Sequence, residues 1–323
     1  MTLPLSGQHL LTRQLATKPA APTADMVSRV AQYRSGPTTF DVSEHGGTLW
    51  IAMNGLPPEP LVGRGPAFTM RDGRTVIFGP LAMRIDGASV PRRDIGAERV
   101  AAFQASLAAS PERGTGDIPV PAWVDTSCGD LVTIDAVDRR IKVELAYATA
   151  DNFMGRPVYP VAIAALRQPV AEALSRVQSA LQAMGYALLV YDAYRPWSIT
   201  RLFWELVPEE SRAFVADPAV GSNHNRGCAV DVTLWDLAGG RPVAMPGRFD
   251  EATPRSAADY DGGTSLERWH RDLLRLAMAA EDFTVHPGEW WHFDHASCAE
   301  SPILDVALSD VASRCGVVAS TSL

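Results

Sequence analysis

Short strand-like runs separated by glycine-centred turns fill the chain between about Thr38 and Val90. The residues TFDVSEHGGTLWIAM (39–53) carry alternating apolar positions on both sides of Gly46-Gly47, which predicts a β-hairpin. The residues AFTMRDGRTVIFG (67–79) repeat this arrangement around Asp72-Gly73. Several short strands with such turns predict a small β-rich domain.

The pattern changes after the Pro/Gly-rich stretch PERGTGDIPVPAW (111–123), which we interpret as a domain boundary. Residues 91–112 before it have the apolar spacing of a helix. Beyond it, helices are expected over 164–185, after Pro196 and over 264–280, and strands over 186–191 and 229–234. Helices and strands mix without βαβ regularity, so the predicted class is α+β, with a small mixed or antiparallel sheet and flanking helices.

These patterns predict three parts of the chain. Residues 1–35 form a tail and linker, which includes the Pro/Ala-rich KPAAPTA (18–24), and residues 36–120 form the β-rich N-terminal domain. Residues 121–323 form the second domain. The full length of 323 residues suits about two domains of ordinary size.

The composition is that of an ordinary globular protein, with 46% hydrophobic and 20% charged residues. The formal net charge of −8 argues against sequence-independent nucleic-acid binding, which needs a basic surface. It also argues against adhesion to an anionic membrane. We therefore expect neither nucleic acid nor membrane as a partner.

The four cysteines, Cys128, Cys228, Cys298 and Cys315, form no CxxC pair. Their spacing indicates neither a zinc knuckle nor a disulfide framework, so we expect small buried or half-buried thiols. The N-terminus lacks the continuous apolar stretch of a signal peptide, and no run of 18 apolar residues occurs. We therefore expect a cytoplasmic protein.

Two short stretches contain the residues of a possible metal site. SNHNRGCAVD (222–231) contributes His224 and Asp231, and EWWHF (289–293) contributes Glu289 and His292. Each stretch alone is weak evidence, because such spacings are common and a histidine beside tryptophans is often a packed core residue. Together they supply a His/Asp/His set, which leaves a fourth position open on zinc, and a carboxylate that can move a proton.

The stretch VYDAYRP (190–196) contributes a cation. Arg195 follows an expected buried strand and precedes a proline. One interpretation is a surface arginine that caps the turn. The other is a fixed positive charge that stabilises a tetrahedral oxyanion, and the position at the end of a strand favours it.

In this order, YATADNF (147–153), YDAYRP (191–196), SNHNRGCAVDVTL (222–234), MPGRFD (245–250) and EWWHF (289–293) resemble the motifs of the D-alanyl-D-alanine dipeptidases. These are zinc peptidases of a wider group that includes D,D-carboxypeptidases and, at the level of the fold, the hedgehog signalling domain. The resemblance covers about residues 134–296.

The resemblance implies one zinc ion per chain in a cleft of the second domain, with His224, Asp231 and His292 as ligands. It implies that Glu289 is the general base and later the general acid for zinc-bound water. It also implies that Arg195 stabilises the oxyanion.

The resemblance further implies that Asp250 and Tyr147 hold the free ammonium group of the substrate, with Ser222 as another substrate contact. A buried carboxylate that pairs with ammonium would make the enzyme demand a free N-terminus. The sequence departs from the family pattern beside Asp250, with a proline in MPGRFD and Ala257 where histidine is usual.

Three functions are compatible with these residues. The leading hypothesis is a zinc dipeptidase that hydrolyses D-Ala-D-Ala or a similar small free dipeptide. The second is a D,D-carboxypeptidase or endopeptidase that acts on peptidoglycan stem peptides. The third is a non-catalytic zinc-containing binding module, which has no need of both Glu289 and Arg195. The oligomeric state and the exact dipeptide stay open.

Overall fold

The computed structural model describes residues 15–107 and 118–315, and its contacts divide the chain into two compact units. Unit 1 contains Ala101–Val243 and the chain from Leu273 onward, and unit 2 contains Ala16–Val100 and Ala244–Asp272. Unit 2 therefore combines the N-terminal strands with a segment from the second half of the sequence. These units are defined by contacts, whereas the domain boundaries at residues 35 and 120 are inferred from sequence patterns. Those boundaries therefore stay a prediction.

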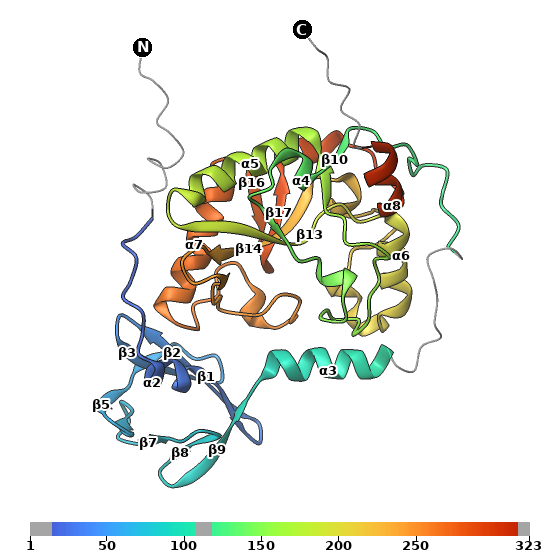
Figure 1. The fold of residues 1–323 in the computed structure, drawn as a ribbon. Helices are drawn as coiled ribbons and strands as arrows, with labels where there is room; N and C mark the ends of the chain where they lie inside the picture. Colours follow the sequence, from blue (N-terminus) through green and yellow to red (C-terminus); the bar gives the residue numbers. More distant parts are fainter. Residues whose placement is uncertain (1–14, 108–117, 316–323) are drawn as a thin grey trace. The chain divides into compact units, whose positions relative to one another are not determined.

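Unit 2 is built on a nine-stranded antiparallel sheet with the order β4-β3-β2-β1-β9-β8-β7-β6-β5 (Figure 1). The strands are β1 (Ala31–Ser35), β2 (Thr38–His45), β3 (Thr48–Met53), β4 (Glu59–Pro60), β5 (Val62–Arg64), β6 (Ala67–Thr69), β7 (Thr75–Phe78), β8 (Ala82–Ile85) and β9 (Ala88–Arg93). The expected β-rich region is confirmed, and Gly46 and Gly47 form the β2–β3 turn at positive φ.

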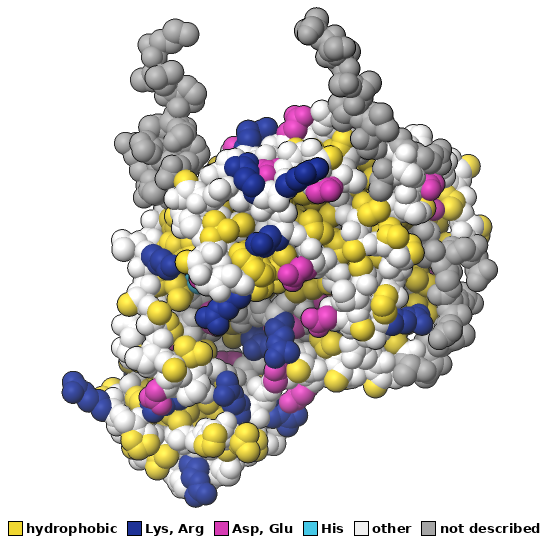
Figure 2. Space-filling model, viewed as in Figure 1, with side chains coloured by type: hydrophobic (Ala, Val, Ile, Leu, Met, Phe, Trp, Pro, Cys, Tyr) yellow, Lys and Arg dark blue, Asp and Glu magenta, His cyan; other side chains and the backbone are white. Residues whose placement is uncertain are grey.

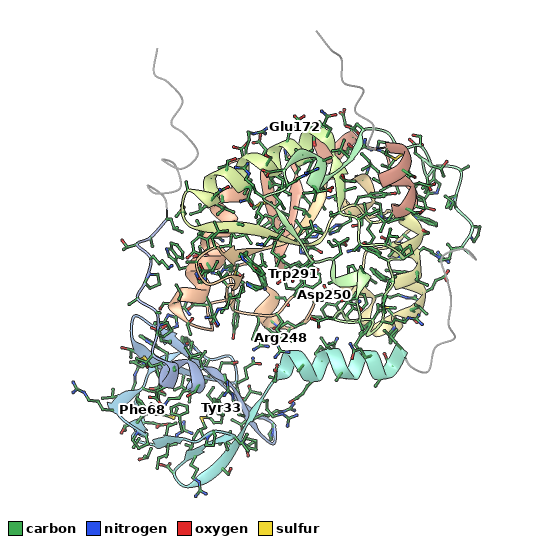
Figure 3. All side chains as sticks on the ribbon, in the orientation of Figure 1. Tyr33, Phe68, Glu172, Arg248, Asp250 and Trp291 are labelled. Carbon is green, nitrogen blue, oxygen red and sulfur yellow. A yellow bond between two sulfur atoms is a disulfide. The ribbon has the colours of Figure 1, made fainter. Side chains whose placement is uncertain are left out.

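Alternation along these strands puts one face of the sheet into an apolar core. Tyr33, Phe40, Val42 and Ile51 are buried there, and Figure 3 shows Tyr33 and Phe68 among the side chains of the sheet. Unit 2 also holds the short helix α2 (Ala24–Arg29), the 3-10 turn η5 (Pro254–Ser256) and the first residues of α3 (Ile95–Leu107) and α7 (Ser265–Ala279).

Unit 1 is built on a mixed sheet with the order β11-β13-β14-β17-β16, in which only the β11–β13 pair is parallel among the described strands. The strands are β11 (Lys142–Val143), β13 (Tyr186–Asp192), β14 (Ala229–Asp236), β16 (Phe283–His286) and β17 (Glu289–His295), with β15 (Arg241–Pro242) beside β14. A separate pair joins β10 (Leu131–Thr133) and β12 (Ala165–Arg167). The α+β class is thereby confirmed.

The helices expected in unit 1 are present, but the one predicted over 164–185 begins later, because Ala165–Arg167 form β12. Helix α5 (Gln168–Gln182) begins with Pro169 in its first turn, and Gly185 at φ 87° follows its end. It packs against β13 (Figure 1). There the Gln178 side chain accepts from the Leu188 amide at 2.8 Å. Helix α6 (Trp197–Leu206) follows Pro196 at its N-cap. The remaining short elements are α4 (Ile134–Val137), η2 (Ala146–Ala148), η3 (Glu209–Phe214), η4 (His224–Arg226), η6 (Ala296–Glu300), α8 (Leu308–Asp310) and η7 (Val311–Cys315).

The helix expected over 91–112 is confirmed for Ile95–Leu107. Its start is wrong, because residues 91–93 pair as part of β9, and residues 108–112 lie outside the described residues. Among the helices that the structure describes, none combines the length and apolarity that crossing a bilayer requires. On the face visible in Figure 2, cationic and anionic side chains of the described residues are interspersed.

The prediction of free thiols is wrong for two cysteines. Cys128 and Cys315 form a disulfide that closes a sequence separation of 187 residues. Spacing could not reveal this pair, because the two residues meet only through the tertiary fold, where η7 packs beside β10. Cys228 matches the prediction, since it is a buried free cysteine.

Candidate metal centre

Strand pairing places two of the predicted ligands opposite each other. In the antiparallel β14–β17 pair, Asp231 is in register with His292. Directly opposite residues project to the same face of a sheet, so the Asp231 carboxylate and the His292 ring meet there. The Asp231 carboxylate is buried.

The third ligand arrives from the short turn before β14. His224 begins η4, and Gly227 ends this turn in the left-handed region at φ 69°. A Cβ at position 227 would lie 2.7 Å from Leu131 Cδ2, so the turn needs glycine for conformation and for space. The tight turn carries the chain from His224 into β14, which holds Asp231.

Three donor atoms converge in this way. His292 Nδ1 lies 3.1 Å from Asp231 Oδ1 and 3.1 Å from His224 Nε2, and His224 Nε2 lies 3.4 Å from Asp231 Oδ1. The three residues form a group whose ligand atoms all lie within 4.8 Å of one another, the only such group of three or more in the part of the chain that the structure describes. Two imidazole nitrogens and one carboxylate oxygen are a donor set that suits zinc.

The opposite ring nitrogens of both histidines are held by acceptors. The Ala193 carbonyl accepts from His224 Nδ1 at 2.7 Å, which leaves Nε2 as the ligand atom. Asp294 Oδ1 lies 3.0 Å from His292 Nε2, which leaves Nδ1 to face the other two donors. Such partners fix ring orientation at metal sites and strengthen the ligand.

The electrostatics of the cluster favour a cation. Burial lowers the pKa of His292, but hydrogen bonds to Asp231 and Asp294 outweigh it and raise this pKa to about 10. Burial raises the pKa of Asp231, but the charges and hydrogen bonds of His224 and His292 outweigh it and lower this pKa. Surroundings that stabilise a proton between these groups also stabilise a metal ion, which competes with protons for the same atoms.

Glu289 stands beside the cluster at the start of β17. Its Oε2 lies 3.8 Å from His292 Nδ1, and its side chain is 35% exposed. It is therefore close to the converging donor atoms and open to water. Trp290 and Trp291, which separate it from His292, are both buried, and their rings lie 5.4 Å apart.

Arg195 is held at the end of β13 by a carboxylate three residues before it. Its Nη2 and Nε donate to Asp192 Oδ2 at 2.6 and 3.0 Å, and its backbone amide donates to the His224 carbonyl at 3.2 Å. Burial lowers the pKa of Arg195, but Asp192 outweighs it and keeps this pKa well above its usual value. The guanidinium is thus a permanent cation, and it is buried rather than exposed on a surface turn.

The predicted substrate residues occupy different parts of the structure. Tyr147 is buried in η2, and the Arg195 guanidinium lies 5.2 Å from the centre of its ring. Ser222 precedes η4, and its Oγ accepts from the His224 amide at 3.2 Å. Asp250 belongs to unit 2, so it does not share a compact unit with the cluster.

Sequence reasoning did not select Asp192 and Asp294, although Asp192 stands within VYDAYRP (190–196) and Asp294 directly follows EWWHF (289–293). Asp192 is fully buried and accepts from Arg195 and from the Tyr159 hydroxyl, the latter at 2.7 Å. The sequence could have indicated both residues, because each is an acidic residue near the end of an apolar strand, and a buried carboxylate needs a partner.

Comparison with known families matches residues 128–313 to peptidase family M15, described as D-ala-D-ala dipeptidase. The chain belongs to this family. The matched region covers more than half of the sequence and includes the complete cluster, while the strands β1 to β9 lie outside it. The expected peptidase family is therefore confirmed.

Individual relatives support the same assignment. The chain is 35% identical to a D-alanyl-D-alanine dipeptidase of Escherichia coli over 175 residues, which cover 54% of this chain and 89% of that protein. It is 33% identical to the protein of the same name from Streptomyces coelicolor, over 51% of this chain and 91% of the relative. For the one from Enterococcus faecium, the identity is 32% and the coverage is 50% and 88%.

Proposed function

We propose that this chain is a zinc-dependent dipeptidase that hydrolyses D-Ala-D-Ala or a similar free dipeptide. The observation that carries the proposal is the convergence of His224, Asp231 and His292 in a member of family M15, with the Glu289 carboxylate 3.8 Å from one ligand atom. The names of the relatives indicate the substrate class.

The residues present fit one zinc ion. His224 Nε2, Asp231 Oδ1 and His292 Nδ1 would hold it, and three protein ligands leave a coordination position for substrate or water. When bound, zinc acts as a Lewis acid and makes water acidic near neutral pH.

Glu289 and Arg195 would carry the remaining chemistry. The Glu289 carboxylate takes a proton from the attacking water and delivers it to the amine as the C–N bond breaks. The permanent charge of Arg195 stabilises the negative oxygen of the tetrahedral intermediate. One water is consumed, and two amino acids leave.

Asp250, Tyr147 and Ser222 would recognise the dipeptide. A carboxylate that pairs with the substrate's ammonium group rejects peptides with a blocked N-terminus, because an amide cannot supply the charge. This role for Asp250 favours a dipeptidase over a carboxypeptidase or endopeptidase on stem peptides.

The test is release of free D-alanine from D-Ala-D-Ala by zinc-loaded protein, compared with N-acetyl-D-Ala-D-Ala. We expect turnover of the free dipeptide and rejection of the blocked one. Equal turnover of both would indicate the carboxypeptidase alternative. Zinc binding at one ion per chain without turnover of either compound would indicate a binding module.

The cytoplasmic location stays a prediction, and the Cys128–Cys315 disulfide weighs against it. Structural disulfides persist mainly in oxidising compartments, whereas cytoplasmic proteins usually keep their thiols reduced. Thiol labelling of the protein in freshly lysed cells tests the location. Labelling of Cys128 and Cys315 would support a reducing compartment, and their protection would support export.

A further inference from the structure

Unit 2 joins two parts of the chain that the family comparison separates. Its segment Ala244–Asp272 lies inside the region matched to family M15, whereas Ala16–Val100 lies outside it. The segment is therefore packed against strands that the family match does not include. It carries Asp250, which in the proposed function binds the ammonium group of the substrate (Figure 3).

One attachment is made by Glu44, at the end of β2. Its side chain accepts from the Ser265 amide at 2.8 Å, which caps the start of α7. Its backbone amide donates to the Gly263 carbonyl at 2.9 Å, and its carbonyl accepts from the Arg268 side chain at 2.9 Å. Glu44 is only 3% exposed, and a buried carboxylate bonded in this way is costly to remove.

A second attachment is made where β9 leads into α3. Asp94 pairs with Arg248 at 2.9 Å, and its other oxygen lies 3.7 Å from Arg255. These pairs are partly exposed and contribute little by themselves. The buried Gly96 is the tighter contact, because a Cβ there would lie 2.5 Å from Glu251 Oε2 and 2.7 Å from Arg255 Nη2.

Glu251 is the part of the segment that Gly96 touches, and it is completely buried. Its two oxygens accept from Arg255 at 2.8 and 2.7 Å, and from the Arg248 amide at 2.9 Å. The residues on either side, Asp250 and Ala252, both have positive φ, at 57° and 47°. Non-glycine residues persist in this region only where the surroundings hold them, and here the bonds of Glu251 do so.

We propose that the N-terminal sheet, together with the start of α3, is a positioning element for substrate recognition. Glu44 on β2 and Gly96 in α3 hold the segment Ala244–Asp272 so that Asp250 adopts one conformation. The inference rests on the proposed function, since it needs Asp250 to bind the substrate's ammonium group. On this proposal, residues outside the family match affect substrate binding, and therefore KM, but leave the chemical step unchanged. Gly96 and Glu44 are positioning residues and touch no substrate.

The main test is Gly96→Ala. Alanine is the better helix former, and no positive φ opposes it at this position, so any loss must come from the contacts with Glu251 and its partner Arg255. We expect KM for D-Ala-D-Ala to rise about tenfold, with kcat and zinc content nearly unchanged, because binding is lost without loss of the catalytic groups. Glu98→Ala is the matched control, since Glu98 lies in the same helix and its side chain pairs with Arg93 on the surface at 2.6 Å.

A double variant separates positioning from general damage. In an Asp250→Asn background, Gly96→Ala should add little, because the two changes act on one interaction. If the two substitutions raise KM by factors that multiply in the double variant, the proposal is overturned. A fall in kcat at unchanged KM in Gly96→Ala would also overturn it. Glu44→Ala should repeat the rise in KM, and Glu44→Gln, which keeps an acceptor, should restore part of it.

Amide hydrogen exchange gives a readout that does not depend on activity. Gly96→Ala should accelerate exchange of the Arg248 amide, and Glu44→Ala that of the Ser265 amide, relative to Glu98→Ala. An active wild type with unchanged KM in both variants would overturn the positioning role alone. A wild type that leaves D-Ala-D-Ala intact would overturn the proposed function and this inference with it.

Discussion

The metal cluster and the segment Ala244–Asp272 both fix charged side chains inside the protein, but by different means. The cluster is set by strand register and a glycine turn, with ligands on β14, on β17 and in η4 just before β14. The segment is set by single side chains, such as Glu44, that reach it from more than 200 positions away in the sequence. The cluster should therefore tolerate changes outside its own sheet, whereas the segment depends on a sheet that the family match does not include.

Removing a ligand should have the largest effect. Asp231→Ala deletes the carboxylate between the buried His224 and the half-buried His292, and we expect loss of zinc and of measurable D-alanine release. His295→Ala is the control, because His295 lies on β17, the strand that carries the ligand His292, and its ring bonds Ser297 instead. Zinc per chain is measured after dialysis. Retention of one tightly bound zinc by Asp231→Ala would show that the cluster is not the metal site.

Glu289→Gln tests the chemistry at a site whose ligands are intact. The amide cannot accept the proton of the attacking water, so kcat should fall by about 10² to 10⁴. Zinc content should stay at the wild-type level, because Glu289 is not one of the three converging ligands. Steady-state kinetics with zinc-loaded protein decide the matter. Turnover near the wild-type rate would remove Glu289 from the mechanism.

Asp294 tests how far the register alone defines the cluster. Its carboxylate holds His292 Nε2 at 3.0 Å, so Asp294→Ala frees the ring to rotate. We expect zinc affinity to fall by about tenfold to a hundredfold, which is the usual effect of losing such a partner. Competition with a fluorescent chelator measures it. Wild-type affinity in Asp294→Ala would mean that strand pairing suffices to orient the ligand.

The sequence predicted the parts of the cluster from local patterns and its ligand set from the family resemblance. Alternation identified the strand around Asp231, and the expected ligands do converge. Helix α5 likewise lies within the range 164–185 predicted from apolar spacing, and Gly185 follows its end as expected. In these regions the periodic pattern and the turn residues determine the strand, the turn and the helix, and the β14–β17 pairing then brings His292 to the other two ligands.

The rest depends on contacts that no spacing records. The Cys128–Cys315 bond and the attachment of Ser265 to Glu44 each join residues about 200 positions apart, and neither residue type signals its partner. The placement of Asp250 in unit 2 escaped prediction for the same reason. The roles of Arg195, Tyr147 and Ser222 stay predictions, because positions alone do not show what a side chain does to a substrate.

The disulfide offers a test in which unit 1 loses stability and keeps its cluster. Replacing Cys128 and Cys315 together by serine reopens a separation of 187 residues. We expect the free energy of unfolding to fall by about 2–4 kcal/mol, largely because the unfolded chain gains freedom. Zinc content and kcat below the unfolding transition should not change. Loss of zinc in the folded double variant would show that the cluster, too, depends on a distant contact.

The smallest effect concerns pH and the attachment of the segment in unit 2. Burial, and then the charge of Arg268, lower the pKa of His45, while Asp261 and Glu44 oppose this. The neutral ring accepts from Arg268 at 3.0 Å through Nδ1. Below the ordinary histidine pKa of about 6.5 the unfolded chain takes up a proton that the folded protein resists. The contribution of His45 to stability is therefore complete above that pH and is lost as the pH falls through the folded pKa.

Exchange of the Ser265 amide should accelerate from about pH 6.5 downward, beyond the intrinsic pH dependence of exchange, and His45→Gln should flatten this trend. If the Ser265 amide shows the same pH profile of exchange in the wild type and in His45→Gln, the segment is held independently of His45. The segment Ala244–Asp272 would then depend less on distant contacts, and so differ less from the metal cluster, than the contacts imply.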